Sequence, residues 1–282
     1  MAKRKKNIGF VDYNLENFHS NTFLRILRGD LAKKGFRVTG GIGLREKPSR
    51  VWAEENDIAY FSDPIALNDA VDAYMVLAPS NPEVHLELCR KVLPFGKPTY
   101  VDKTFAQDLN SARKIFALAD KYRVPLQTTS ALRYTNVQEY VKEIGRSKVK
   151  HMVAWGGGRS FGEYAIHPVE LTISCMGPNV QRVQRRGSGK YSQLLLEFSG
   201  GRTAVINVYI KSRSGYAATV TTAEKTEYFR VDPREMFYNT TLSIMDMIQS
   251  GRPSIPRKES LVIRRILDLA EEDRTVKGFV RV

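Results

Sequence analysis

The first half of the chain alternates short β-rich runs with amphipathic helical segments, and this alternation constrains the fold more than any other feature. The runs are NIGFVDY (7–13), FRVTGGI (36–42), IAYF (58–61), AYMVLAP (73–79), PTYVDK (98–103) and VPLQTTS (124–130). The intervening segments place apolar residues at i, i+3 and i+4, as Ala112, Ile115 and Phe116 do within 109–121. Strands that alternate with helices in this way form a parallel sheet covered by helices on both faces. We therefore expect an α/β fold with a doubly wound parallel sheet over residues 1–130.

The second half has a different pattern, in which β-rich runs follow one another with Gly-rich turns and few crossover helices. These runs are VKHMVAWGG (149–157), SQLLLEF (192–198), TAVINVYI (203–210), AATVTT (217–222) and TEYFRV (226–231). Such an order is typical of an open, largely antiparallel sheet. Two helices should follow, over 236–249 and 261–273. We expect a C-terminal α+β domain over residues 131–282, joined to the first domain without a flexible hinge.

Composition is that of a globular protein and narrows the setting in which the chain works. Its apolar stretches are all shorter than the roughly 20 residues that span a bilayer. The basic N-terminus MAKRKKN lacks the apolar region of a secretory signal. Cys89 and Cys175 are too few for a disulfide framework and lack metal-ligand spacing. We expect a cytoplasmic protein with no bound metal and no membrane partner.

A net charge of +14 indicates an anionic partner, such as nucleic acid, a phosphate-bearing cofactor or an acidic substrate, or else a solvated basic surface. The excess charge is spread over 3–6, 182–186, 252–258 and the final helix. The sequence has no helix-turn-helix pattern, no zinc spacing and no aromatic RNA-binding motif. We therefore do not expect a nucleic-acid partner.

A doubly wound sheet binds its ligand at the carboxyl ends of its strands, near the point where the strand order reverses. Several predicted strands end in residues that could bind a ligand at that edge. They are Pro79, Ser80 and Asn81 after the fourth run, Asp102 and Lys103 at the end of the fifth, and Arg133 and Tyr134 after the sixth. These residues are candidates for cofactor and substrate binding.

The segment from AYMVLAPSNPEVHLELC to VPLQTTSALRY resembles the core of the Gfo/Idh/MocA oxidoreductases. In that family an apolar strand leads to a Pro-containing turn and a His, and a later strand ends in Glu-Lys-Pro, here Asp102-Lys103-Thr104. EYAIHPVELTISCMGP resembles the family's D-x-x-x-H-x-x-D segment, with Glu163, His167 and Glu170 at its three positions. MIQSGRPSIPRKESLVIRRILDLAEE resembles its C-terminal helix–loop–helix, so the resemblance extends over nearly the whole chain.

The resemblance implies a Rossmann domain followed by a C-terminal domain whose open sheet often forms oligomer contacts. It implies NAD(P)-dependent oxidation of a sugar, inositol or related polyol, or the reverse reaction. His167 matches the base that takes the hydroxyl proton, and Glu163 would hold its ring in orientation. Lys103 would stabilise negative charge on the reacting oxygen. We expect a homodimer or homotetramer, because the strand-rich segment 192–231 lacks the helices to cover both faces of its sheet.

Each of these residues also has a structural interpretation. Lys103 can be a solvated lysine at a strand end, and His167, which precedes a proline, can be a structural histidine. Glu163 can be an acid that stabilises a helix N-terminus. Arg133 and Tyr134 either contact the substrate or the nicotinamide, or cap the last strand of the sheet.

The turn after the first strand, DYNLEN, lacks the glycines of the G-x-G-x-x-G fingerprint and holds Asp12, Asn14 and Asn17 in their places. Asn tolerates positive φ, so the turn itself can form. An inward-pointing Asp12 would put a carboxylate where the two phosphates of the cofactor should lie. The N-terminus of the following helix still favours an anion. Asp12, Tyr13, Asn14 and Leu15 are therefore candidate cofactor-binding residues.

The segment after the second strand, GGIGLREKPSR, contains Glu46 as its only acid, together with Arg45, Lys47 and Arg50. A basic cluster at this point favours the 2′-phosphate of NADP, whereas a solvated loop would explain the same residues. Two functions therefore stay open. One is an NAD(P)-dependent oxidoreductase that prefers NADP, and the other is a non-catalytic ligand-binding or regulatory protein whose cofactor site has degenerated.

Overall fold

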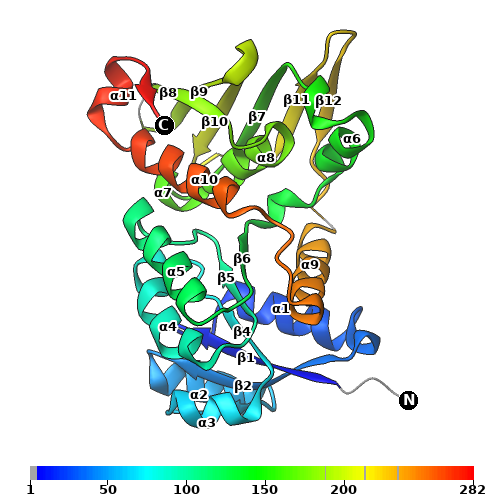
Figure 1. Ribbon diagram of the computed structural model, residues 1–282, viewed down its shortest axis with the longest axis vertical. Coiled ribbons are helices and arrows are strands. Elements are labelled where there is room, and N and C mark those ends of the chain that lie inside the picture. The colour runs from blue at the N-terminus through cyan, green and yellow to red at the C-terminus, as the bar shows by residue number, and fades with distance from the viewer. Residues whose placement is uncertain (1–4, 188, 213, 234) are drawn as a thin grey trace. The chain divides into compact units, whose positions relative to one another are not determined.

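The computed structural model describes residues 5–187, 189–212, 214–233 and 235–282 of the chain. The chain forms two compact units (Figure 1). The first unit comprises Met1–Thr129 and Phe237–Ile255, and the second comprises Ser130–Met236 and Pro256–Val282. The start of the basic segment MAKRKKN lies outside the described residues.

These units differ from the predicted division at residue 130 in one segment, because 237–255 packs with the first unit. Helix α9 (Met236–Ser250) buries Ile244 and Met247 in the hydrophobic core of that unit. The side chain of Gln127 also bonds to this segment, donating to Ser243 Oγ (2.9 Å) and accepting from the Ser254 backbone N–H (2.8 Å). Helical periodicity predicts an apolar face but does not tell which core that face will join.

The first unit is built on a six-stranded parallel sheet with the order β3-β2-β1-β4-β5-β6 (Figure 1). The strands are β1 (Lys6–Asp12), β2 (Phe36–Gly43), β3 (Ala59–Tyr60), β4 (Ala73–Val76), β5 (Thr99–Asp102) and β6 (Leu126–Thr129). The predicted doubly wound parallel sheet is thereby confirmed. The strand order reverses between β1 and β4, so the carboxyl ends of these two strands mark the place where this kind of sheet binds a ligand.

Helices connect these strands and cover the sheet. They are α1 (Phe18–Arg28), α2 (Glu46–Glu55), α3 (Pro64–Ala70), α4 (His85–Val92) and α5 (Leu109–Lys121), with short 3-10 turns η1 (Ala32–Lys34), η2 (Pro82–Val84) and η3 (Leu93–Phe95). Asn17, Asp63 and Asp108 cap α1, α3 and α5, each accepting hydrogen bonds from N–H groups of the first turn. The polar cap residues thus fix where each helix begins at the carboxyl edge of the sheet.

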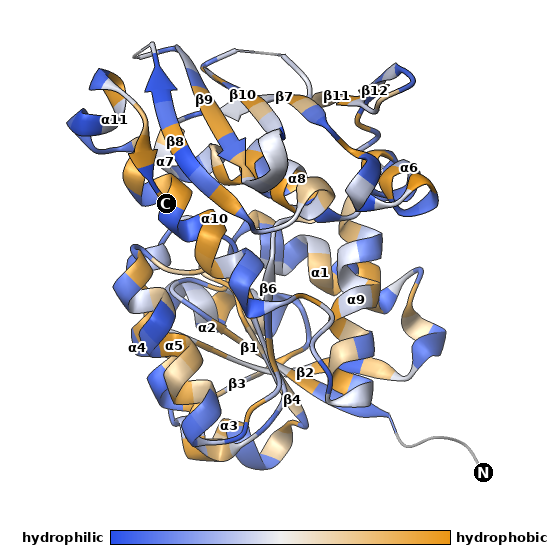
Figure 2. Cartoon of the chain, turned by 45° about the horizontal axis from the view of Figure 1, so that its top comes forward, coloured by the Kyte–Doolittle hydropathy of each residue, from blue (hydrophilic) through white to orange (hydrophobic). Residues whose placement is uncertain are grey.

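The second unit contains a mixed sheet of seven strands in the order β12-β11-β7-β10-β9-β8-β13. The strands are β7 (His151–Gly158), β8 (Val180–Arg186), β9 (Tyr191–Phe198), β10 (Thr203–Ile210), β11 (Ala217–Thr221), β12 (Thr226–Arg230) and β13 (Val280–Arg281). Only β7 and β10 pair in parallel among the paired strands of the described residues. The predicted open and largely antiparallel sheet is confirmed. Strand β8, with five charged or amide side chains in VQRVQRR, is coloured hydrophilic over most of its length in Figure 2.

Helix α8 (Ile166–Met176) lies against one face of this sheet, in contact with β7 and β10. It is hydrophobic nearly all round, as expected for a helix buried within a core. The other helical elements are η4 (Ala131–Arg133), α6 (Asn136–Ile144), η5 (Arg146–Lys148), α7 (Phe161–Tyr164), η6 (Ser199–Gly201), α10 (Arg257–Ala270) and α11 (Asp273–Lys277). The opposite sheet face carries Tyr191 and Tyr228, whose exposed fractions are 67% and 65%. The expected oligomer contact through this face stays a prediction.

The described ranges contain neither a membrane-spanning helix nor a cluster of metal ligands. None of the helices there is both long enough and apolar enough to cross a bilayer. Within the same ranges, His, Cys, Asp and Glu side chains do not gather in threes or more as a metal site requires. Cys89 and Cys175 are free and buried, and burial raises the pKa of the Cys175 thiol to about 12. Both cysteines therefore serve as small hydrophobic core residues.

Candidate functional site

The carboxyl edge of the first sheet contains a cavity of about 160 Å³ at the ends of β1, β2 and β3. Asp12, Gly43, Glu46, Tyr60 and Lys91 are among its lining residues. The cavity occupies the position in which a Rossmann sheet binds the adenosine of a dinucleotide. A cavity is therefore present at the sheet edge where the sequence predicts that a ligand binds.

Asp12 points inward, as the sequence analysis considered, and is buried with an exposed fraction of 1%. Its carboxylate accepts hydrogen bonds from Asn17 Nδ2 (2.8 Å), Ser20 Oγ (3.2 Å) and the Asn14 backbone N–H (3.2 Å). Burial raises the pKa of Asp12 to about 6, although these hydrogen bonds act in the opposite direction. At pH 7 the turn thus encloses a carboxylate that is largely ionised.

The N-terminus of α1 is capped by the chain itself. Asn17 Oδ1 accepts from the backbone N–H groups of His19 (2.9 Å) and Ser20 (3.0 Å). In a Rossmann turn such N–H groups bind the pyrophosphate of the cofactor. Because a side-chain oxygen occupies them here, and because the Asp12 carboxylate lies beside them, this turn does not fit a pyrophosphate. The predicted cofactor-binding residue Leu15 is fully buried in the hydrophobic core.

Lys103 lies at the end of β5 as a buried cation, with an exposed fraction of 6%. Its ammonium group donates to the carbonyl oxygen of Pro79 (2.9 Å), so the predicted residues Pro79 and Lys103 are brought together. The neighbouring Asp102 carboxylate accepts from the Lys103 backbone N–H (2.8 Å) and from Tyr100 Oη (3.0 Å). These contacts fix the backbone from which the lysine side chain extends.

Asp102 also contacts His19, a residue of α1, with Nδ1 of His19 lying 2.5 Å from Oδ2 of Asp102. Burial alone would raise the pKa of Asp102, but the charge and hydrogen bond of His19, together with Lys103, lower it. The carboxylate is therefore held in its ionised form. No local sequence pattern indicates that His19 reaches the end of β5, because the contact joins residues far apart in the sequence.

The loop after β4 is held by His85, which is completely buried. Its Nε2 lies 2.8 Å from the Leu77 carbonyl oxygen, and its Nδ1 lies 3.0 Å from that of Phe105. The predicted residue Ser80 is exposed, and Asn81 donates to the Glu83 side chain (2.9 Å). The His85 contacts support the loop that presents Pro79 to Lys103.

The basic segment after β2 lies on the surface beside the cavity. Arg45 is exposed, and its backbone N–H donates to the carbonyl oxygen of Tyr13 (2.8 Å). Arg50 pairs with Glu46 at 2.7 Å and stacks over the ring of Tyr60 at 4.6 Å. The segment thus places both positive and negative side chains near the cavity. The preference of the protein for NADP stays a prediction.

In the second unit, His167 lies in the first turn of α8, and its Nδ1 is 2.7 Å from Ser130 Oγ. Its ring also meets the rings of Tyr164 and Tyr216 edge to face, at centroid distances of 5.7 and 5.8 Å. Ser130, which sequence analysis did not select, ends the run VPLQTTS and is the partner that orients the imidazole. The role predicted for Glu163, a half-buried residue of α7, stays a prediction.

Two glycines of β7 make room for these tyrosine rings. A Cβ on Gly156 would lie 2.6 Å from Tyr216 Cδ1, and a Cβ on Gly158 would lie 2.1 Å from Tyr164 Cδ1. Both distances are far shorter than a carbon–carbon contact allows. The Gly-rich end of β7, which belongs to the predicted β-rich run VKHMVAWGG and its flank, therefore shapes the surroundings of His167.

Arg133 belongs to a buried ion-pair network rather than to the surface. Its guanidinium donates to Glu170 (2.7 Å) and to Glu259 (2.6 Å), and Arg146 donates to Glu259 as well (2.8 Å). Burial would lower the pKa of Arg133, but the two carboxylates raise it. Glu170 also accepts from the backbone N–H of Ser130 (2.7 Å), so the network fixes the partner of His167. The predicted substrate or nicotinamide contact of Arg133, like that of the half-buried Tyr134, stays a prediction.

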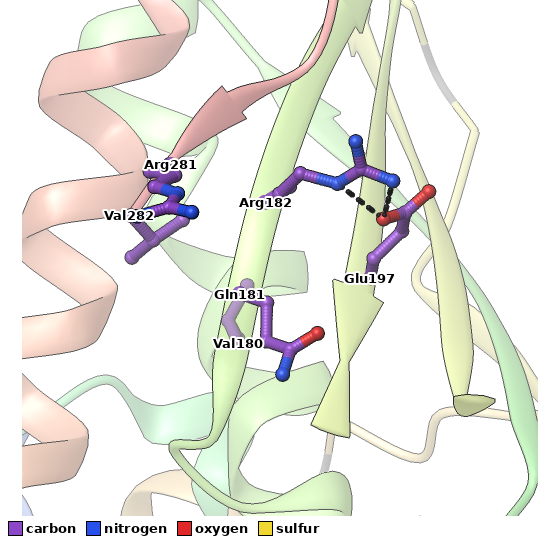
Figure 3. A pocket seen from close by; sticks show the side chains of 6 residues that line it. All are labelled: Val180, Gln181, Arg182, Glu197, Arg281 and Val282. Atoms are coloured by element: carbon purple, nitrogen blue, oxygen red, sulfur yellow. Dashed lines mark hydrogen bonds and ion pairs between the residues drawn. The ribbon is translucent and has the colours of Figure 1, made fainter. Parts of the chain in front are cut away.

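A larger cavity of about 560 Å³ lies at the edge of the second sheet (Figure 3). It is lined by Val180, Gln181, Arg182, Glu197, Arg281 and Val282, and the Arg182 guanidinium pairs with Glu197 at 2.6 Å. The cavity is open to solvent and contains none of the predicted site residues. Despite its size, we assign it no part in the candidate chemistry.

Comparison with known proteins found no matching family model and no similar curated protein sequence. Solved structures do match over almost the full length of the chain. One is apo scyllo-inositol dehydrogenase from Lactobacillus casei, with 11% identity, 100% of this chain and 99% of that chain covered, and a TM-score of 0.84. GenD2 from gentamicin A biosynthesis, solved in complex with NAD, has 15% identity, coverage of 100% and 97%, and a TM-score of 0.81. UDP-N-acetylglucosamine 3-dehydrogenase GnnA from Acidithiobacillus ferrooxidans has 15% identity, coverage of 97% and 98%, and a TM-score of 0.78. These likenesses establish the fold that the sequence predicted.

Proposed function

We propose that the chain is an NAD(P)-dependent oxidoreductase that acts on a sugar, an inositol or a related polyol. The observation that carries the proposal is the buried ammonium group of Lys103 at the carboxyl edge of the first sheet. Burying a lysine costs free energy that a strand-end lysine in solvent avoids, so a structural role alone explains it poorly. The sugar and inositol dehydrogenases that share the fold support the same reaction class.

The residues of the chain match the proton chemistry that oxidation of a secondary alcohol requires. Ser130 Oγ can accept a hydrogen bond from Nδ1–H of His167, and in this tautomer Nε2 is the basic nitrogen that would take the hydroxyl proton. Lys103 would stabilise the negative charge that develops on the same oxygen. A nicotinamide cofactor, when bound, would supply the hydride acceptor, or the donor in the reverse reaction. Glu163 is proposed to assist the orientation of His167.

We propose NADP as the preferred cofactor, because basic residues are frequent in the segment that contributes to the cavity at the end of β2. Arg45, Lys47 and Arg50 belong to the segment that follows this strand, and Lys91 lines the cavity itself. A 2′-phosphate would gain from these charges, whereas the 2′-hydroxyl of NAD would not. Glu46 weakens the effect, since it already pairs with Arg50.

We further propose a homodimer or homotetramer formed through the open face of the second sheet. Tyr191 and Tyr228 are large exposed side chains on that face, and their rings contact those of Tyr209 and Trp155. Exposed aromatic side chains of this kind are enriched in subunit interfaces. The two free cysteines are consistent with a reduced, cytoplasmic setting, which we also propose.

A second candidate function is non-catalytic ligand binding on the same fold, and the self-capped β1–α1 turn favours it. One experiment separates the two. Wild-type protein is assayed at 340 nm with a panel of sugars, inositols and sugar acids in the presence of NADP or NAD. The enzyme hypothesis predicts turnover that Lys103→Met nearly abolishes while the fold is retained. If no substrate is turned over, or if Lys103→Met is fully active, the proposed function is wrong.

A further inference from the structure

We infer that the β1–α1 turn is closed to the diphosphate of a dinucleotide by its own side chains, so that a dinucleotide is recognised mainly through its two ends. This inference rests on the proposed function, because it concerns how the proposed cofactor is held. It also departs from the Rossmann fingerprint, in which the backbone N–H groups of this turn bind the diphosphate.

The first line of evidence is that the donors of the turn are already used. Beyond the two N–H groups capped by Asn17, the Glu16 backbone N–H donates to Asn14 Oδ1 (3.2 Å). The Leu15 backbone N–H donates to Ser49 Oγ (3.1 Å), a residue of α2. A diphosphate that approached the turn would have to displace these side-chain acceptors before it gained a hydrogen bond.

The contact between Ser49 and the turn is built into the neighbouring strand. A Cβ on Gly43, at the end of β2, would lie 2.1 Å from Ser49 Oγ. The absence of a side chain at Gly43 therefore gives the Ser49 hydroxyl the space from which it reaches Leu15. In a fingerprint turn, a glycine lets the cofactor come close to the backbone. Here the glycine at position 43 lets the Ser49 side chain come close instead.

The second line of evidence is charge. The Asp12 carboxylate accepts hydrogen bonds from the Asn17 and Ser20 side chains and from the backbone of Asn14 and Ala78. Like charges repel most strongly where water is excluded, and Asp12 is almost completely buried. The positive end of the α1 dipole, which would attract a diphosphate, is thus already balanced by a carboxylate and by the Asn17 amide oxygen.

Asn17→Gly tests the inference directly, since glycine is tolerated at a helix N-cap at small cost. The variant removes the acceptor that occupies the His19 and Ser20 N–H groups. Thr135→Gly is the matched control, because Thr135 caps α6 in the second unit by a side-chain bond to Val137 N–H. Binding of AMP, ADP and NADPH is measured by calorimetry at fixed salt for wild type and both variants, with thermal unfolding to confirm the fold.

For wild type we expect ADP and AMP to bind with affinities that differ by less than about threefold, because the second phosphate finds no free donor in the turn. For Asn17→Gly we expect ADP to bind roughly tenfold or more tightly than AMP, the usual worth of a hydrogen bond to a charged group. Thr135→Gly should behave like wild type. ADP that binds wild type tenfold more tightly than AMP overturns the inference, and so does an Asn17→Gly variant without any gain for ADP.

The same titrations keep the inference separate from the proposed function. NADPH that fails to bind wild type overturns the proposed function, whereas a gain for ADP in Asn17→Gly would still support the closed turn. NADPH that binds wild type, together with a large preference for ADP over AMP, supports the proposed function and overturns the inference.

Discussion

Replacing Asp12 by Asn should change how the stability of the first unit depends on pH. Burial raises the pKa of Asp12 from 3.8 to about 6, so between about pH 4 and pH 6 the folded state holds a proton that the unfolded chain has already released. This difference in pKa corresponds to about 3 kcal/mol in the free energy of unfolding. Asp12 has a higher pKa in the folded state than in the unfolded chain. Its ionisation therefore destabilises the fold progressively as the pH rises from about 4 to 6. Below about pH 4 the contribution is absent, and above about pH 6 it is fully present.

The assay is urea unfolding followed by fluorescence, at pH values from 4 to 8. Trp52 is buried in the first unit and donates to Asn21 Oδ1 (2.7 Å), so it reports on that unit. A Trp155→Phe background removes the signal of the second unit. We expect the free energy of unfolding of wild type, relative to Asp12→Asn, to fall by about 2–3 kcal/mol between pH 4 and pH 7.

Comparing the two proteins removes the contributions of all other titrating groups, which are common to both. Asp63→Asn, which changes an exposed N-cap carboxylate of the same unit, serves as the control and should track wild type across the whole range. A difference between wild type and Asp12→Asn that stays constant with pH would refute the reasoning. It would mean that the hydrogen bonds to the Asp12 carboxylate fully offset the cost of burying its charge.

Further outcomes are expected for catalysis, cofactor choice and assembly. His167→Ala should lower kcat/KM by about 10²–10⁴, the usual worth of a positioned general base, and Ser130→Ala by about tenfold or less, because it removes only the partner of the ring. NADPH should bind more tightly than NADH, with a preference that shrinks as salt is added, and equal affinities in fluorescence titrations would contradict this. Light scattering should detect at least a dimer at micromolar concentration, and Tyr191→Lys combined with Tyr228→Lys should shift it to monomer. A monomeric wild type would contradict the interface.

The parallel sheet could be predicted because its strands are short apolar runs separated by helical periods, and both signals are local. The assignment of 237–255 to the first unit could not be predicted in this way, because the apolar face of α9 fits any core of the right shape. The contact between Ser130 and His167 joins residues from two predicted elements, and neither element carries a pattern that indicates the other. Asp12 was recognised as a departure from the fingerprint, but only the structure shows that its carboxylate is turned inward and held by several hydrogen-bond donors.

The structure also connects the closed turn to Lys103. The His19 backbone N–H is held by Asn17, its ring contacts Asp102, and Asp102 accepts from the Lys103 backbone N–H. The side chains that occupy the phosphate-binding donors therefore also fix the helix start that supports the lysine.

Opening the turn should consequently have two opposite effects in one variant. Asn17→Gly should increase affinity for ADP, as argued above, and lower kcat because His19 loses the cap that holds it against Asp102. His19→Gln, which leaves the Asn17 cap acceptor and the backbone N–H groups in place, should lower kcat without the gain in ADP affinity. Both quantities can be measured on the same protein samples, by calorimetry and by steady-state turnover. If Asn17→Gly gains affinity and keeps full kcat, then Lys103 does not depend on the start of α1, and the turn is closed for a reason unrelated to catalysis.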